Sequence, residues 1–184
     1  MSGGNLMEVI VEDNNPKWPE MFETEATKLR EVFGEELMVV YHIGSTSVPG
    51  LKAKPIIDIM PLVRNIEVVD KFNDKMITLD YEPMGECGIT ERRYFRKGGD
   101  VQTYHVHVFE LGSIGAERHL AFRNFLREHK DDALKYGELK ATLANRFPND
   151  ISAYIAGKNN FIKDLEQKAI AWYRKKTDHY QFSL

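Results

Sequence analysis

The chain has 184 residues, of which 42% are hydrophobic and 29% charged, a composition that excludes a disordered or fibrous protein. Its length suits one domain with a substantial apolar core. The net charge of −3 arises from 25 basic and 28 acidic residues spread along the chain, so it gives no electrostatic case for binding nucleic acid or a membrane.

The single cysteine, Cys87, has no disulfide partner within the chain, and no apolar run is long enough to span a bilayer. No signal-peptide pattern opens the sequence, so we expect a cytoplasmic protein. Cys87 also lacks the C-x-x-C or Cys/His spacing of a redox or metal motif. We therefore expect a half-buried thiol rather than a reactive one.

An N-terminal helix is predicted within residues 11–33. Asn, Asp and Pro residues at its start are helix-start signals, and apolar side chains then recur at helical spacing. The helix should pack one face on the core, through Trp18, Met21, Phe22, Leu29, Val32 and Phe33.

Two strands and a hairpin are predicted in the middle of the chain. The segments 37–45 (LMVVYHIGS) and 55–63 (PIIDIMPLV) are short, rich in β-branched residues and bounded by Gly or Pro. Their apolar residues point both ways, so we expect central strands covered on both faces. An amphipathic helix is expected over 66–80, and a hairpin over 89–110 with its turn at Gly98, Gly99 and Asp100.

From about residue 117 the pattern changes to three helices, expected over 117–130, 132–147 and 150–176. Asp150 is an N-cap signal for the third. The fold class is therefore α+β: a mixed β-sheet flanked by helices, over residues 8–112, followed by a C-terminal helical segment, 113–184.

The turn at 44–47 (Gly-Ser-Thr-Ser) brings backbone N–H groups and three hydroxyls together, and such a turn can hold phosphate oxygens. Because Gly and Ser mark turns of every kind, an ordinary turn is the alternative. A P-loop does not fit, since five residues separate Gly44 from Gly50 and Leu51 precedes Lys52.

Asp58 lies between Ile57 and Ile59 in the second strand, where an unpaired carboxylate is costly to bury. A structural Asp that accepts backbone N–H bonds is one interpretation. A metal or another cation at this carboxylate is the interpretation we prefer.

A strand, a Gly-Ser turn, 12 intervening residues and an Asp on the next strand resemble the signature of the nucleotidyltransferase superfamily. More closely, the segment HIGSTSVPGLKAKPIIDI (42–59) resembles the defining segment of the GrpB family, whose fold is nucleotidyltransferase-like. The resemblance extends through NPKWPEMFETEATKL (15–29), YHVHVFE (104–110), HLAFRNFLREH (119–129) and YIAGKNNFI (154–162). It speaks more to fold than to reaction.

The resemblance implies that Gly44 and Ser45 hold a triphosphate, while Asp58 and a second carboxylate two residues on bind a divalent metal, Mg or Mn. Two such ions clamp the attacking and leaving oxygens of an in-line phosphoryl displacement. In this chain the second position is Met60, so the carboxylate pair is broken. Either other side chains complete the site or the domain binds without reacting.

His105 and His107 lie two apart on a predicted strand, so both imidazoles point to one face. With Asp58 they could hold a softer metal such as manganese or zinc, or donate hydrogen bonds to phosphate. The alternative is a pair of half-buried structural histidines. Glu110 has the opposite parity and is a weaker candidate.

Two lysines fall inside the apolar stripes of the last two helices. Lys140 lies in the stripe of Tyr136, Leu139, Leu143 and Phe147. Lys158 lies near the centre of the stripe of Tyr154, Phe161, Ile162, Leu165, Ala169 and Trp172. Each either reaches the rim with its charged end or faces substrate phosphates in a cleft between helices and sheet.

The arginines are weaker candidates. Strand parity puts Arg92 and Arg96 on one face and Arg93 on the other, so they cannot all serve one pocket. For Arg123 and Arg127, which share a helix face with His119, we expect a solvated face or local ion pairs.

The predicted catalytic residue is Asp58, with Asp58, His105 and His107 as metal ligands. The predicted phosphate- or substrate-binding residues are Gly44, Ser45, Thr46, Ser47, Lys54, Arg93, Lys140, Tyr154 and Lys158.

Two functions remain open, with a nucleotide or other phosphorylated small molecule as the expected partner. The first is metal-dependent nucleotidyl or phosphoryl transfer. The second is a catalytically inactive binding module, linked to coenzyme A metabolism because GrpB-like domains also occur fused to dephospho-coenzyme A kinase. A purely structural or protein-interaction domain ranks last.

Overall fold

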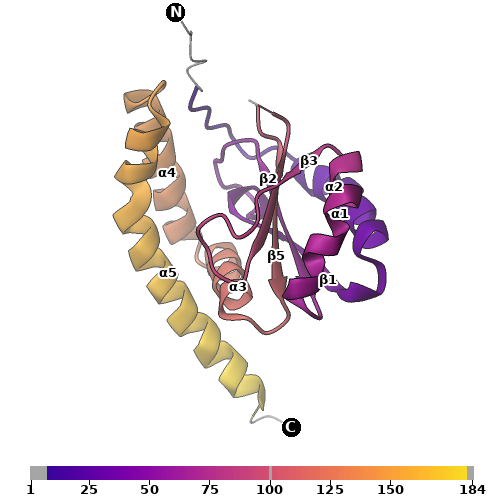
Figure 1. Ribbon diagram of the computed structural model, residues 1–184. Coiled ribbons are helices and arrows are strands. Elements are labelled where there is room, and N and C mark those ends of the chain that lie inside the picture. Colours follow the sequence, from indigo (N-terminus) through magenta and orange to yellow (C-terminus); the bar gives the residue numbers. More distant parts are fainter. Residues whose placement is uncertain (1–7, 100, 182–184) are drawn as a thin grey trace, which may run out of the picture.

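The structure, a computed structural model, describes residues 8–99 and 101–181, with side chains up to residue 177 (Figure 1). Its helices are α1 Trp18–Phe33, α2 Asn73–Thr78, α3 Ile114–Glu128, α4 Lys130–Arg146 and α5 Ile151–Gln181. Its strands are β1 Leu37–Ile43, β2 Ile57–Val63, β3 Tyr81–Pro83, β4 Arg93–Lys97 and β5 Tyr104–Glu110. Short 3₁₀ turns cover Gly34–Glu36, Ser45–Ser47 and Ile66–Phe72.

The five strands form one mixed sheet in the order β1-β2-β5-β4-β3. β2 and β5 are parallel, and the other neighbouring pairs are antiparallel. β2 is central, as expected, but β1 lies at the edge of the sheet, which corrects the prediction that both strands are central. No described strand pairs with the outer side of β1. Its apolar residues still point to both faces of the sheet, because helices cover both faces there.

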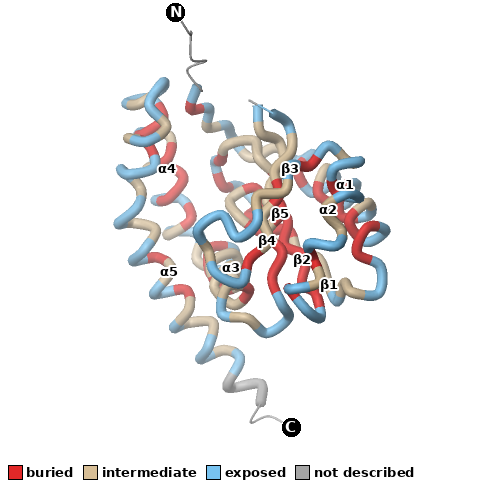
Figure 2. The backbone as a smooth tube through the Cα atoms, in the orientation of Figure 1, coloured by how far each residue is buried: buried red, intermediate tan, exposed pale blue. Residues whose placement is uncertain are grey.

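Helices cover the two faces of this sheet (Figure 1). On one face Ile57, Ile59 and Val63 of β2 pack with α1 and the 66–80 segment in the larger core. On the other face Met60 and Leu62 pack with Ala116 of α3. Because successive strand residues alternate between faces, Asp58 points to the α3 side with Met60. Figure 2 shows the buried residues concentrated in the strands and on the inner sides of the helices.

The N-terminal helix packs its apolar face on the core as predicted, with Trp18, Phe22, Leu29, Val32 and Phe33 buried. The 66–80 segment differs from the single helix expected. It forms a 3₁₀ helix, with its start capped by the Asn65 side chain, followed by the short α2. Asp80 then adopts a positive φ of 65°, which ends the helical segment before β3.

β4 and β5 form the predicted antiparallel hairpin, and Gly98 adopts a φ of 107° at its turn. Asp100, also predicted in this turn, lies outside the described residues. Cys87 is exposed, which corrects the prediction of a half-buried thiol. It lies at a positive φ of 47° in the loop before β4, and this loop turns its side chain toward solvent.

The three C-terminal helices are present with shifted ends. α3 begins three residues earlier than predicted, because the Ser113 side chain accepts a hydrogen bond from the Ala116 N–H and caps it. The Asp150 carboxylate accepts from the Ala153 N–H at 2.9 Å, which confirms the predicted cap of α5. Among the helices that the structure describes, none is long and apolar enough to cross a membrane.

The C-terminal helices share a core with the loop that follows the Gly-Ser turn. Val48 and Leu51 of this loop pack with Phe125 of α3, Tyr136 of α4 and Leu165 of α5. α5 crosses close to α4 at Gly157, where an added Cβ would lie 2.5 Å from a methyl group of Leu143. This close crossing brings the lysine-bearing sides of α4 and α5 toward the sheet.

Candidate functional site

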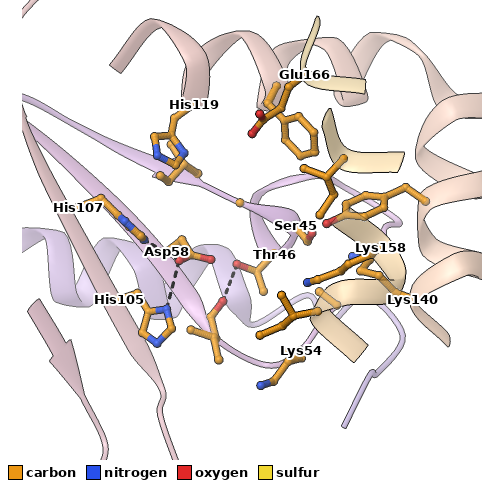
Figure 3. A pocket seen from close by; sticks show the side chains of 18 of the residues that line it. Ser45, Thr46, Lys54, Asp58, His105, His107, His119, Lys140, Lys158 and Glu166 are labelled. Atoms are coloured by element: carbon orange, nitrogen blue, oxygen red, sulfur yellow. Dashed lines mark hydrogen bonds and ion pairs between the residues drawn. The ribbon is translucent and has the colours of Figure 1, made fainter. Parts of the chain in front are cut away.

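A cavity of about 350 Å³ lies on the α3 side of the sheet, where β1 ends and β2 and β5 begin. The Gly-Ser turn, Lys54 and the first residues of β2 and β5 form its sheet side, and α3, α4 and α5 cover it (Figure 3). Its polar lining residues are Ser45, Thr46, Lys54, Asp58, His105, His107, Arg118, His119, Tyr136, Lys140, Tyr154, Lys158 and Glu166.

Gly44 brings the turn against Asp58. Its backbone has φ 69° and ψ −173°, a region adopted essentially by glycine alone. A Cβ added there would lie 2.5 Å from Asp58 Oδ2, well inside a van der Waals contact. Only glycine therefore allows the turn backbone to approach the carboxylate this closely.

Two of the three turn hydroxyls already have partners within the turn region. Thr46 Oγ1 donates to the Ile56 carbonyl at 3.1 Å and lies 3.0 Å from His42 Nε2, while Ser47 Oγ donates to the Gly44 carbonyl at 2.6 Å. Ser47 does not line the cavity, which corrects its assignment to the phosphate-binding set. Ser45 lines the cavity, where its hydroxyl is a hydrogen-bond partner of the Tyr136 side chain, so the turn offers the site this shared hydroxyl and its backbone.

Asp58 is held by two imidazoles. His107 Nε2 lies 2.9 Å and His105 Nδ1 3.5 Å from Asp58 Oδ1, and the carboxylate side chain is 25% exposed. Burial opposes ionisation of Asp58, but the contacts with His105 and His107 outweigh it and lower the pKa of the carboxyl well below its usual range. Asp58 is therefore a carboxylate paired with histidines, and no backbone N–H group of the described residues caps it.

The hydrogen bonds of the other ring nitrogens of His105 and His107 determine which nitrogen atoms can bind a metal. His105 Nε2 lies 2.7 Å from Gln102 Oε1, an acceptor, so this nitrogen carries a proton; in the charged ring Nδ1 also donates to Asp58, and in the neutral ring Nδ1 keeps a lone pair for a metal. His107 Nδ1 lies 3.4 Å from Arg92 Nη1, which can only donate, so its Nε2 carries the proton that it donates to Asp58. Asp58 and His105 thus fit a divalent metal directly, whereas His107 fits only if Arg92 releases it.

The opposite side of the cavity is cationic. Figure 3 shows Lys140 and Lys158 across from Asp58 and the two histidines, with Lys54 below them on the segment before β2. The Lys140 side chain is buried, its Nζ has no hydrogen-bond partner among the described residues, and it lies 4.4 Å from the Tyr136 ring centroid. Burial and the nearby Lys158 lower the pKa of Lys140 to about 7.

The pKa values of the other two cavity lysines, Lys158 and Lys54, are lowered as well. Lys158 Nζ lies 4.7 Å from the Tyr154 ring centroid, and burial together with the Lys54 charge lowers its pKa. Burial also lowers the pKa of Lys54. None of the three lysines forms an ion pair with a residue that the structure describes. Their arrangement favours an anion in the cavity, because an anion would relieve both the repulsion and the burial cost.

Residues 8–168 match the GrpB protein family. The chain belongs to the GrpB family. It is 48% identical over 158 residues to the UPF0157 protein YqkA of Bacillus subtilis (strain 168), a match that covers 86% of this chain and 46% of that protein. The chain therefore spans about half the length of this relative.

The crystal structure of the conserved protein GrpB from Enterococcus faecalis is also similar, with 45% identity and a TM-score of 0.86 over 89% of this chain and 99% of that one. Terminal uridylyl transferase 4 from Trypanosoma brucei with bound dUTP has a TM-score of 0.51 at 10% identity, over 90% of this chain and 56% of that one. This likeness shows the fold, and it confirms the predicted nucleotidyltransferase-like sheet and helices.

More distant is the dephospho-CoA kinase of Mycolicibacterium paratuberculosis. It is 25% identical over 183 residues, a match that covers 86% of this chain and 45% of that protein.

In this GrpB-family chain the residue two positions after Asp58 cannot supply a metal ligand. Met60 is fully buried and packs with Ile43, Leu62 and Phe109 under α3. Glu110, the weaker carboxylate candidate, lies at the far end of β5 and accepts a hydrogen bond from the Ile66 N–H at 3.2 Å. Among the described residues Asp58, His105 and His107 are the group able to hold a metal ion.

The arginines of β4 and its approach divide between the two faces. Arg93 pairs with Asp70 at 2.8 Å on the α1 side and does not line the cavity, which corrects its assignment to the phosphate-binding set. Arg92 is buried on the site's side, where it donates to the Glu86 and Cys87 carbonyls and contacts His107. Arg92 therefore positions His107, and it was not among the predicted site residues.

Arg123 and Arg127 form no ion pair with the described residues, which corrects the expectation of a solvated face or local pairs. Arg123 Nη1 donates to the His42 carbonyl at 3.1 Å. Arg127 donates to the Ser47 carbonyl through Nε and Nη2, at 3.0 and 2.7 Å. Both side chains thus hold the ends of the Gly-Ser turn from outside the main cavity.

Four further polar lining residues were not assigned to the site from sequence: Arg118, His119, Tyr136 and Glu166. Arg118 lies 3.7 Å from Glu166, an ion pair that joins α3 to α5. The Nε2 of His119 is buried without a hydrogen-bond partner among the described residues, and burial lowers the pKa of His119 to about 3, so the ring is neutral. One sequence signal was available: Tyr136 and Tyr154 each precede a cavity lysine by four residues, one helical turn.

The contact between Gly44 and Asp58 can be measured with a double-mutant cycle. We expect Gly44→Ala to lower the free energy of unfolding by about 3 kcal/mol, because backbone strain and the clash with Asp58 add. In an Asp58→Ala background the same substitution should cost about 1–2 kcal/mol less, since the backbone strain and the contact with the residue 58 Cβ remain but the clash with the carboxylate is removed. Urea unfolding of the four proteins measures both values, and equal costs in the two backgrounds would refute the contact.

Proposed function

We propose that this chain binds a phosphorylated small molecule, with a nucleoside triphosphate as the leading candidate, in the cavity between the sheet and α4–α5, and that it catalyses metal-dependent nucleotidyl or phosphoryl transfer. The observation that carries the proposal is the buried Lys140 Nζ, which has no partner among the described residues and lines the cavity with Lys54 and Lys158. A buried ammonium group without an acceptor is costly, and phosphate oxygens would supply acceptors.

The two halves of the cavity suggest separate tasks. Ser45 and the backbone of the turn face the lysines across the cavity, so phosphate oxygens would be bound from both sides. Phe122, Tyr136 and Tyr154 supply aromatic surface for an uncharged part of the ligand. α4 and α5 cover the cavity and restrict the access of water, which strengthens the lysine–phosphate interactions.

A divalent metal fits the Asp58 side of the cavity. Asp58 and His105 Nδ1 would hold it, and Gln102 would orient His105 through its Nε2–H. When bound, the metal would neutralise charge on the phosphate that reacts. Since imidazole together with carboxylate suits manganese better than magnesium, we propose Mn²⁺ as the preferred ion.

The alternative function is a binding module without catalysis. The buried Met60 supports it, because no carboxylate of the described residues replaces the missing second ligand. The name of the dephospho-CoA kinase relative supports a link to coenzyme A metabolism, with a phosphorylated pantetheine or adenosine compound as the ligand. In this alternative the lysines and the turn bind phosphate in the same way.

Catalysis and binding are separated by one pair of measurements. The chain is mixed with Mn²⁺ and each of the four nucleoside triphosphates, and both the melting temperature and the release of pyrophosphate or phosphate are recorded. A higher melting temperature with product release above that of an Asp58→Asn variant supports transfer. A higher melting temperature without product supports the binding module, and no change with any nucleotide or with dephospho-coenzyme A contradicts both.

Lys140 predicts a pH dependence of anion binding. A lysine is charged below its pKa, so affinity for sulfate, whose own charge is constant here, should fall as the pH rises above about 7. We expect a loss of about tenfold between about pH 6.5 and about pH 8.5, measured by calorimetry, because one proton is linked to binding. Lys140→Met should bind weakly at both pH values, while the exposed Lys163→Met should behave as wild type. A pH-independent affinity in the wild type would contradict the role of Lys140.

The tautomers of His105 and His107 predict how much each of these residues contributes to metal binding. Asp58→Asn should weaken Mn²⁺ binding about a hundredfold, and His105→Gln about tenfold or more, as measured by electron paramagnetic resonance. His107→Gln should have the smaller effect of the two histidine variants, because Arg92 holds the proton on its metal-facing nitrogen. The exposed Asp74→Asn serves as the control. A larger loss in His107→Gln than in His105→Gln would overturn the tautomer assignment.

A further inference from the structure

A second cavity lies on the other side of the Gly-Ser turn, at the β1 edge of the sheet. It measures about 390 Å³, a size typical of ligand cavities, and is formed by the approach to α1, by β1, by the turn and by α3. Thr46 lines both this cavity and the main one. The two cavities therefore share the turn as a common wall.

The charged groups of this second cavity are Arg123, Arg127 and Glu23. Glu23 is exposed and lies 3.7 Å from Arg30, which does not line the cavity. Neither arginine has a carboxylate partner among the described residues. Burial and the charge of Arg127 lower the pKa of Arg123 to about 10, so Arg123 lies in the field of a second positive charge on the same helix.

Each guanidinium group keeps N–H donors that no described residue accepts. Arg123 uses Nε for Asn124 and Nη1 for the His42 carbonyl, which leaves Nη2. Arg127 uses Nε and Nη2 for the Ser47 carbonyl, which leaves Nη1. These contacts, to two backbone carbonyls and to the Asn124 side chain, fix both planar groups in place, so their remaining donors are preorganised for an oxyanion.

Beside Asn14, His42, Thr46 and Ser47, the rest of the cavity is apolar. Its walls are the side chains of Pro16, Pro19, Phe22, Val40, Tyr41 and Pro49, with Asn14 as a further polar group. His42 is buried and stacks on Phe22, and burial lowers its pKa to about 4, so it adds no positive charge. Such walls suit a ligand that carries an apolar body behind its anionic group.

We propose that this cavity is a second binding site, which takes a small molecule with a phosphate or carboxylate group on an apolar body and holds the oxyanion between Arg123 and Arg127. The site differs from the main cavity in its cations, which are guanidinium groups rather than ammonium groups, and in lacking the Asp and His cluster. The proposal for this second site does not depend on the function proposed for the main cavity.

Phenyl phosphate, benzoate and inorganic phosphate are the probes. The Nε–Hε signals of Arg123 and Arg127, assigned with single Arg→Lys variants, are followed by nuclear magnetic resonance as each probe is added to the full chain. We expect saturable shifts of both signals, with phenyl phosphate or benzoate binding about tenfold more tightly than inorganic phosphate because the walls are apolar. The tighter of the two aromatic probes identifies the anionic group. Unchanged signals at saturation of the main cavity would overturn the proposal.

Stoichiometry separates the two sites. Equilibrium dialysis of phenyl phosphate should show one bound molecule fewer in Arg123→Gln/Arg127→Gln, and the Arg123→Lys/Arg127→Lys variant, which keeps both charges, should retain that molecule. Lys140→Met/Lys158→Met should lose the other bound molecule and keep this one. The same stoichiometry in the folded Gln variant as in wild type, checked by circular dichroism, would overturn the second site, and loss only in the Lys→Met variant would leave the main cavity as the sole site.

Discussion

The approach of the Gly44 backbone to the Asp58 carboxylate is the constraint on which the site depends. It joins the end of β1 to the start of β2, so it fixes where the Gly-Ser turn lies relative to the sheet. The turn is then held from both sides: Thr46 bonds to the chain before β2, and Arg127 of α3 bonds to the Ser47 carbonyl. As a result, the positions of the strands and of α3 determine the shape of the main cavity.

In the main cavity the negatively charged Asp58 has partners, whereas the lysines have no ion-pair partner among the described residues. On the sheet side the Asp58 carboxylate has imidazole partners, and these in turn are oriented by Gln102 and Arg92. On the helix side the lysines contact aromatic rings but form no ion pair with the described residues. A cation–π contact offsets part of the cost of burying an ammonium group and leaves its N–H donors available. The negative half is therefore satisfied internally, and the positive half depends on a ligand.

Much of this arrangement could be predicted from local sequence patterns. The segment 42–59 identified the family and fold, strand parity placed His105 and His107 on one face, and helical periodicity singled out Lys140 and Lys158. These predictions succeeded because alternation and helical spacing are properties of single elements.

The predictions that failed required knowledge of how elements dock. Arg93 was chosen from a run of basic residues, but its face packs on the α1 side of the sheet, and Ser47 turned its hydroxyl back to Gly44. His119, Arg118 and Glu166 reach the cavity only through the docking of α3 and α5, which no local pattern reports. The edge position of β1 likewise follows from strand order, which alternation does not specify.

Met60 has a consequence for how readily this site could change its chemistry. Its side chain fills space between the sheet and α3, in contact with an apolar cluster that includes Phe109 and Ala116. A carboxylate substituted there would be buried among hydrocarbon groups and would leave a void beside them, so gaining a ligand would mean losing part of the core. A single substitution at this position is therefore not enough to add a second metal ligand, because the packing between the sheet and α3 must change at the same time.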